Sequence, residues 1–473
     1  MSVTPIGYVL LLIGPLLMFW RPRWLYFLTV FFLPFTATGV ANVGEGLDAS
    51  AVQVSMFLGT LLIARCLWNF LREGSFPIWR SDAKSLMWLG LFILSTAISL
   101  VMPIWINGHV RIPSPHLLDL STTPLYLNSH NITGVLYMVY GFLFAYLIAV
   151  FNHTITTLRS TITAFMAGSA FSAVWALVEL GCKITGLPYP AVLFNTGTGL
   201  STMGYKEQLG EHLYRLSSVG VEPSIFAQSL LVAVAMYLPF VFGRLTLFGK
   251  KQDRVLFCFL FTVLCLTTAS TAYLGIGFTV VLLFVLLTIR GLLSVKHLFH
   301  AIAGLTITGL LYLFVPVVQR VADEVLISKS GGYSAIERLM TIHNTWEMFV
   351  RYPVLGIGWG SITSHDLVVN ILGNGGIAAA VPFVIAVAFT FRALYRSISR
   401  RRRLARVSDL MHMDFAMYVA LAVTLFTSLL SGFLNVFSFF WFTWGLAIAI
   451  GGMDSLAQIK SVREVAVAKR ALA

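Results

Sequence analysis

The sequence predicts an all-α polytopic membrane protein, and three observations lead to this fold class. Of its 473 residues, 58% are hydrophobic and only 11% are charged, whereas a soluble domain carries about a quarter charged residues. Continuous apolar runs of roughly 20 residues recur along the chain, and each can cross about 30 Å of hydrocarbon as a helix. The runs lack the two-residue alternation of strands, so helices rather than a closed barrel are expected.

The apolar runs define the expected membrane spans. The first two runs are closely spaced, and only a short turn at 269–271 separates two others. The number of transmembrane helices is therefore expected to be about 12–14. The first run precedes Arg21 and Arg23 instead of following basic residues, so we expect a retained span rather than a cleaved signal. The runs cover residues 5–20, 24–42, 51–71, 86–105, 133–151, 161–182, 224–243, 255–270, 272–289, 298–318, 376–394, 414–432 and 436–453.

Long and short connections alternate between these runs. Three long connections cover 106–132, 183–223 and 319–375, whereas those of the opposite set are short and basic. Basic residues concentrate in cytoplasmic loops, so the long loops are expected outside the cytoplasm. We divide the chain into N-terminal helices with their loop (1–132), a transmembrane core with two large structured loops, 183–223 and 319–375 (133–455), and a cytoplasmic tail (456–473).

Charge and cysteine content narrow the functional classes. The net charge of +13 is explained by basic cytoplasmic loops, so we expect no nucleic-acid partner. The four cysteines lie in or beside apolar runs without a CxxC pair, which predicts neither a disulfide framework nor a zinc site. No cluster of carboxylates suggests a metal ion, and no cofactor is expected.

The first polar segment of interest covers residues 214–227. Arg215 is followed by two serines and a glycine, and Pro223 suits the first turn of a helix. The amino end of a helix offers free N–H groups to an anion, and a neighbouring guanidinium can hold phosphate oxygens with two hydrogen bonds. The segment therefore predicts a phosphate site, although a lone arginine outside the membrane is more often only solvated.

The second polar segment begins with an expected helix in the third long loop. Ser334 and Glu337 have the spacing of a capping box, with Ser334 as the N-cap. Proline and the Gly356-x-Gly358-x-Gly360 run are expected to end the helix in a tight turn with positive φ angles. Its apolar face is expected to carry Ile336, Leu339, Met340, His343 and Trp346.

A histidine follows this turn. His365 is either an interfacial side chain with a satisfied hydrogen bond or an acid/base group, because imidazole titrates near neutral pH. Asp366 is either its orienting partner or another loop acid. Gly376 is expected to open the next span.

The order of these parts resembles the superfamily of O-antigen ligases, Wzy-type polysaccharide polymerases and pilin oligosaccharyltransferases. Its members have a polytopic helical core, large periplasmic loops, an arginine segment ending in Asn-Pro or Glu-Pro, and a Pro-x-x-Gly-x-Gly turn followed by a histidine and Gly-Ile. The resemblance covers about 130 to 450. Its motifs lie at Arg215, Glu222-Pro223, Pro353 to Gly358, His365 and Gly376-Ile377.

The resemblance implies a glycosyltransferase of the bacterial inner membrane with its active site facing the periplasm. His365 would accept the proton of the acceptor hydroxyl, and Arg215 would stabilise the diphosphate of an undecaprenyl-diphosphate-linked glycan. Candidate protein partners are a flippase and a chain-length regulator. The expected substrate-binding residues are Arg338, Glu222, Ser270, Thr271 and Lys206, with Arg320 as a further phosphate candidate.

Two departures from the ligase pattern favour a polymerase. Ligases carry an arginine after the serine of a short outside turn, where this chain has Ser270-Thr271-Ala272. Their histidine is usually followed by Asn, Ser or Gln, but Asp366 stands here. An O-antigen ligase remains the alternative within the resemblance. A lipid-linked glycan flippase or transporter is the alternative from another class, although carriers usually keep ionisable groups near the membrane midplane.

Overall fold

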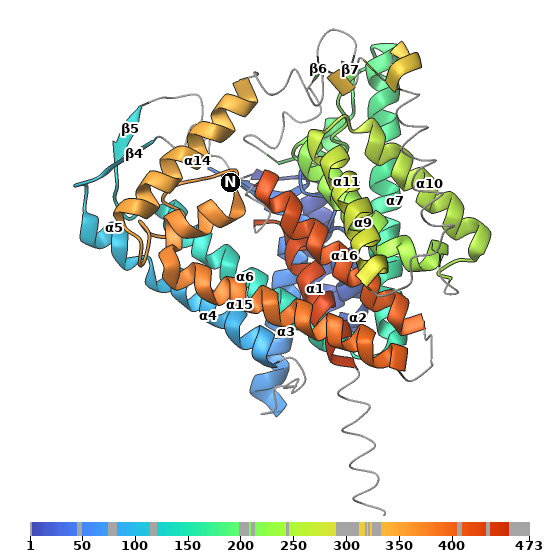
Figure 1. The fold of residues 1–473 in the computed structure, drawn as a ribbon, viewed down its shortest axis with the longest axis horizontal. Coiled ribbons are helices and arrows are strands. Elements are labelled where there is room, and N and C mark those ends of the chain that lie inside the picture. Colours follow the sequence, from blue (N-terminus) through green and yellow to red (C-terminus); the bar gives the residue numbers. More distant parts are fainter. Residues whose placement is uncertain are drawn as a thin grey trace, which may run out of the picture.

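A computed structural model gives the fold of the chain (Figure 1). The structure describes residues 2–44, 50–73, 83–113, 121–197, 208–209, 213–242, 246–289, 312–316, 319, 322–323, 333–403, 409–431 and 436–453. The expected cytoplasmic tail and most of the expected span at 298–318 lie outside these residues.

Long apolar helices form most of the described chain. Eight of them have the length and composition to cross a membrane, which confirms an all-α polytopic membrane protein. They are α3 (Val54–Glu73), α4 (Ala83–Ile98) continuing into α5 (Val101–Ile106), α6 (Ser129–Phe151), α7 (Ile155–Thr185), α9 (Pro223–Phe242), α11 (Ser270–Ile289), α15 (Leu367–Arg403) and α16 (Asp409–Leu430). The shorter helices of the bundle are α1 (Pro5–Trp20), α2 (Pro22–Phe31), α10 (Lys250–Leu266) and an apolar helix at Ser438–Met453.

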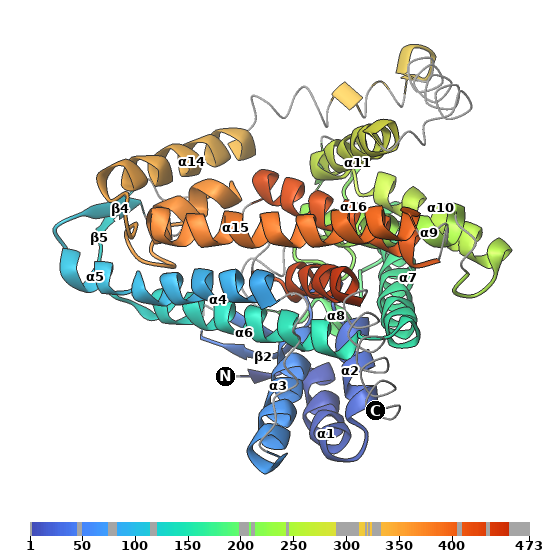
Figure 2. The same ribbon diagram turned by 60° about the horizontal axis from the view of Figure 1, so that its bottom comes forward.

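The helices pack around α9, which is almost wholly enclosed by α7, α10, α11 and α16. A second group places α15 against α4, with α6 beside α4 (Figure 2). The aromatic side chains of Trp441 and Trp444 are fully buried. The Trp444 indole donates to the Thr390 hydroxyl at 3.0 Å, which fixes the last helix against α15.

Successive connections of the bundle gather at two opposite ends. The connection after α2 contacts the one before α9, where the Ala37 N–H donates to the Val219 carbonyl at 2.9 Å. The connection after α4 contacts the one before α15, where the Trp359 N–H donates to Ser99 Oγ at 3.0 Å. We call this the polar end. At the other end, the basic end, Arg159 donates to the Thr246 carbonyl.

The expected span over 24–42 is wrong. Helix α2 ends at Phe31, and the chain continues through turns into strand β2 (Gly39–Val43), which pairs with β1 (Ser2–Val3) and β3 (Ser50–Gln53). The turns after α2 are buried and contact the 194–197 and 217–221 segments. Thr38 donates to the Phe194 carbonyl at 2.5 Å, and the Ala37 N–H donates to the Val219 carbonyl. Tertiary contacts thus overrule local hydropathy here. Two further hairpins lie at β4 (Arg111–Pro113) with β5 (Thr122–Pro124), and at β6 (Gln208–Leu209) with β7 (Leu213–Tyr214).

Helix α14 (Tyr333–Arg351) forms the polar segment before α15. It begins at Tyr333, so Ser334 lies inside the helix and the expectation that Ser334 is the N-cap is wrong. The expected apolar face is exposed rather than buried, with Leu339 66% exposed, because the opposite face of α14 packs on α15 through Thr345 and Met348.

The glycine turn after α14 has the expected positive φ angles at Gly356, Gly358 and Gly360. Element α15 begins at Leu367 and joins two helical segments across a kink at Gly376, where the φ angle is 62°. The second segment starts at this kink, as expected for Gly376, whereas the segment from Leu367 precedes the expected span. A Cβ at Gly376 would lie 2.2 Å from the Val354 carbonyl oxygen. Only glycine allows the turn to lie this close to α15.

Candidate functional site

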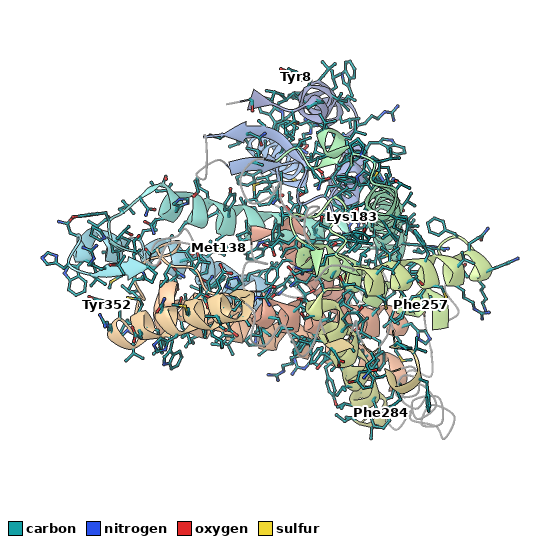
Figure 3. The ribbon with its side chains drawn as sticks, turned by 90° about the horizontal axis from the view of Figure 1, so that it is seen from above. Tyr8, Met138, Lys183, Phe257, Phe284 and Tyr352 are labelled. Carbon is teal, nitrogen blue, oxygen red and sulfur yellow. The ribbon has the colours of Figure 1, made fainter. Side chains whose placement is uncertain are left out.

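The Arg215 segment is held by a buried carboxylate on α7. Glu179 has no exposed side-chain surface, and it accepts the Ser218 N–H at 2.6 Å and the Ser217 N–H at 3.1 Å. Lys183, one turn later, donates to Glu179 at 2.8 Å and to the Arg215 carbonyl at 2.5 Å. Figure 3 shows Lys183 on α7. These bonds fix the backbone from the Arg215 carbonyl to Ser218.

The start of α9 lies directly after this segment. Ser224, buried in the first turn, donates to the exposed Glu222 carboxylate at 3.0 Å. The turn before α11 lies beside the same segment, since Thr268 donates to the Tyr214 carbonyl at 3.3 Å. Ser270 and the buried Thr271 form the first turn of α11. The structure therefore brings Arg215, Glu222, Ser270 and Thr271 to one part of the polar end.

Helix α14 places Arg338 and Thr341 beside His365. The Thr341 hydroxyl is 3.0 Å from Nδ1 of His365 and donates to the Arg338 carbonyl at 2.9 Å. With its hydrogen directed to that carbonyl, Thr341 accepts from Nδ1–H. This tautomer makes Nε2 the nitrogen that can accept a proton. Burial and, as the smaller cause, the charge of Arg338 together lower the pKa of His365 from its ordinary value to about 4.

Glu337 connects the two halves of the site. Burial raises the pKa of Glu337, the neighbouring Arg338 lowers it, and the Glu222 carboxylate raises it again. The electrostatic effect of Glu222 shows that the first turns of α14 approach the start of α9. Figures 1 and 3 show α14 running from the region of the β4–β5 hairpin and Tyr352 towards the middle of the molecule.

The guanidinium of Arg338 is the strongest sign of an anion site. Its Nε is buried and has no hydrogen-bond partner within the described part of the chain, and a buried donor without a partner carries a desolvation cost. Phosphate oxygens satisfy a guanidinium with short charge-assisted hydrogen bonds. Arg338 therefore becomes the principal candidate for a second phosphate contact, while Lys206 and Arg320 lie outside the described residues.

Asp366 has a structural role rather than the role of orienting His365. Its carboxylate accepts the Val369 N–H at 2.8 Å and so caps the first turn of α15. The orienting group is Thr341, which the sequence analysis missed because nothing in the spacing distinguishes it from other polar residues of α14. Glu179 and Lys183 were also missed as site residues, although their four-residue spacing at the end of an apolar helix was a usable signal.

Comparison with known proteins adds no family assignment. No protein-family model and no curated protein sequence matches the chain. The observations that indicate a function are therefore the geometry of the polar end and the order of the motifs.

Glu179→Ala is expected to destabilise the protein and weaken anion binding together. Each N–H left without its acceptor costs about 1–3 kcal/mol, and Lys183 loses its carboxylate partner. The melting temperature in detergent and the affinity for inorganic diphosphate should both fall. The control is Glu347→Ala, because that carboxylate is partly exposed and pairs only with His343 at 3.4 Å. Equal melting temperatures in the two variants would contradict a bracing role for Glu179.

Proposed function

We propose that the protein is a polysaccharide polymerase that transfers glycan from undecaprenyl diphosphate to a lipid-linked acceptor. The observation that carries the proposal is the pairing of Arg338, whose buried Nε has no partner in the described chain, with His365 and Thr341. A cation for a diphosphate thus lies beside a base for a hydroxyl. The motif order of the ligase and polymerase superfamily supports the same chemistry.

The transfer proceeds by displacement at the anomeric carbon. Nε2 of His365 takes the proton of the acceptor hydroxyl as the new carbon–oxygen bond forms. The bond from the anomeric carbon to the phosphate oxygen breaks, and undecaprenyl diphosphate leaves as an anion. Arg338 and Arg215 stabilise the negative charge that develops on this leaving group.

The alternation of the two bundle ends supports a periplasmic site. Arg21, Arg159 and Lys250 lie at helix termini of the basic end, whereas His365 lies at the polar end. Basic residues mark the cytoplasmic side, so the polar end faces the periplasm of a bacterial inner membrane.

Labelling of single cysteines tests this orientation. In a background without the four native cysteines, Leu187→Cys at the polar end is expected to react with an impermeant thiol reagent in intact spheroplasts. Leu187 is 64% exposed. Gln252→Cys, exposed at the basic end, should react only after the membrane is broken. The reverse pattern would place the site in the cytoplasm and exclude the proposed periplasmic reaction.

The pH dependence of transfer reports the state of His365. Because its pKa is lowered to about 4, the acidic limb of kcat/KM is expected near pH 4 instead of pH 6.5. Arg338→Gln should move that limb to higher pH. The folded pKa lies below the unfolded value, so the contribution of His365 to stability is present above about pH 6.5 and is lost as the pH falls towards 4. An acidic limb at pH 6.5 in both the unchanged protein and Arg338→Gln would contradict the electrostatic coupling of Arg338 to His365.

A deletion in cells tests the function itself. Loss of a polymerase is expected to abolish polymer and leave single repeat units on undecaprenyl diphosphate at the periplasmic face. Loss of a ligase would instead leave long lipid-linked polymer, and loss of a flippase would leave repeat units at the cytoplasmic face. Either of these two outcomes would replace the proposed function.

A further inference from the structure

A cavity adjoins the proposed base but does not belong to the diphosphate site. Its volume is about 590 Å³, and its walls come from the β4–β5 hairpin, the start of α6, one face of α14 and the glycine turn. Thr341 lines the cavity and also lies 3.0 Å from Nδ1 of His365. A molecule in the cavity is therefore separated from the imidazole by a single side chain.

The lining has the chemistry of an uncharged, many-hydroxyl ligand. No Asp, Glu, Lys or Arg occurs among the described residues that line it, and the imidazole of His130 carries no permanent charge. The lining therefore offers no fixed charge to match a phosphate or another charged group. Amide, hydroxyl and phenol groups dominate the polar part, and amides and hydroxyls both donate and accept hydrogen bonds. They come from Thr123, Asn128, Thr133, Tyr137 and Asn344.

The lining also differs from a site for a polyprenyl tail. A hydrocarbon chain gains nothing from these amides and hydroxyls, and covering them without offering hydrogen-bond partners would cost free energy. The aromatic rings of Tyr126 and Tyr137 offer an apolar face together with a polar tip. Sugars have the same combination of apolar ring faces and hydroxyl edges, and a volume of this size lies within the usual range of about 300–1,000 Å³ for ligand pockets.

The cavity walls are held in place by buried hydrogen bonds. Asn131 on α6 donates to the Trp359 carbonyl and to Ser361 Oγ, both at 2.8 Å. Asn374 on α15 accepts the Ser361 N–H at 3.1 Å. At Gly360, a Cβ would lie 2.6 Å from the His130 carbonyl oxygen, so α6 and the turn meet without room for a side chain. The cavity is therefore built before any ligand arrives.

We infer that this cavity binds the terminal, uncharged sugar of the acceptor glycan and holds its hydroxyl beside Thr341, next to the imidazole of His365. The inference rests on the proposed glycan transfer and assigns the two substrates to different places. The diphosphate donor lies with Arg338 and Arg215, and the acceptor lies between α6, the β4–β5 hairpin and α14. The cavity therefore selects an acceptor whose terminal sugar is neutral.

The test uses the repeat-unit oligosaccharide released from its lipid by mild acid. Binding to the full chain in nanodiscs is measured by saturation-transfer NMR, and affinity at the donor site is measured separately with undecaprenyl diphosphate, which carries no sugar. Asn344→Ala removes one lining amide and is expected to weaken oligosaccharide binding about tenfold, equivalent to about 1.4 kcal/mol, while donor affinity stays unchanged. His343→Ala is the matched control, because this side chain is exposed on the same helix and does not line the cavity.

Each outcome separates this inference from the proposed function. Unchanged oligosaccharide affinity in Asn344→Ala, or displacement of the oligosaccharide by an excess of sugar-free undecaprenyl diphosphate, would overturn the acceptor site even if the protein makes polymer. Loss of donor affinity in Asn344→Ala would overturn it as well. Oligosaccharide binding that depends on Asn344, in a protein that forms no polymer, would support the sugar site and count against the polymerase.

Discussion

His365→Ala is expected to slow glycan transfer by about 10²–10⁴-fold, the usual contribution of a general base. Affinity for the lipid diphosphate should change little, because Arg338 and Arg215 remain in place. His365→Gln keeps a hydrogen-bonding group opposite Thr341 but has no basic nitrogen, so it should be nearly as slow. Donor affinity and turnover are measured separately with purified protein and lipid-linked repeat units.

The control for this prediction is His343→Ala, since His343 is exposed and contacts Glu347. Its turnover should equal that of the unchanged protein. Substantial turnover in His365→Gln but not in His365→Ala would limit His365 to positioning the acceptor. Full turnover in His365→Ala would remove the base and leave only the arginines as catalytic candidates.

Arg338→Lys is expected to reduce transfer by about 10²–10³-fold, comparable with the loss of one donor to a developing anion. Lysine keeps the positive charge but loses the planar guanidinium that fits two phosphate oxygens. It also removes the Nε donor, which is buried without a partner in the described part of the chain. Arg215→Lys should show a loss of the same kind while the protein remains folded.

The matched control is Arg351→Lys, because Arg351 is exposed in the last turn of α14, away from Arg338. Donor titrations by fluorescence and single-turnover rates distinguish weaker binding from slower chemistry. Near-normal rates and affinities in Arg338→Lys would show that a point charge is sufficient there. The proposed two-bond contact would then be wrong.

The helical class could be predicted from the sequence, because a run of apolar residues is recognised without any knowledge of tertiary contacts. The prediction from hydropathy failed at 24–42, where α2 ends at Phe31 and buried contacts to the Arg215 segment replace the membrane as the apolar environment. It also missed the helical segment from Leu367, which precedes the kink at Gly376. The positive φ angles of Gly356, Gly358 and Gly360 followed from the spacing alone.

The candidate site was predictable in its residues but not in its connections. Arg215 and His365 stood out by residue type and neighbours, and both lie at the polar end. The contact of Thr341 with His365 and the brace from Glu179 to Ser218 depend on helix packing between segments 24 and 39 residues apart. Spacing rules within one helix do not reach that far. The role of Asp366 also required the structure, because a helix cap and an imidazole partner are the same residue type.

The most direct test of the central claim is a single coupled measurement. Purified protein in proteoliposomes receives lipid-linked repeat units, and released undecaprenyl diphosphate is quantified together with the length of the glycan products. The account predicts one undecaprenyl diphosphate for each repeat unit added, with both signals lost in His365→Ala. Movement of intact lipid-linked units across the bilayer without release of undecaprenyl diphosphate would contradict the account and identify a transporter.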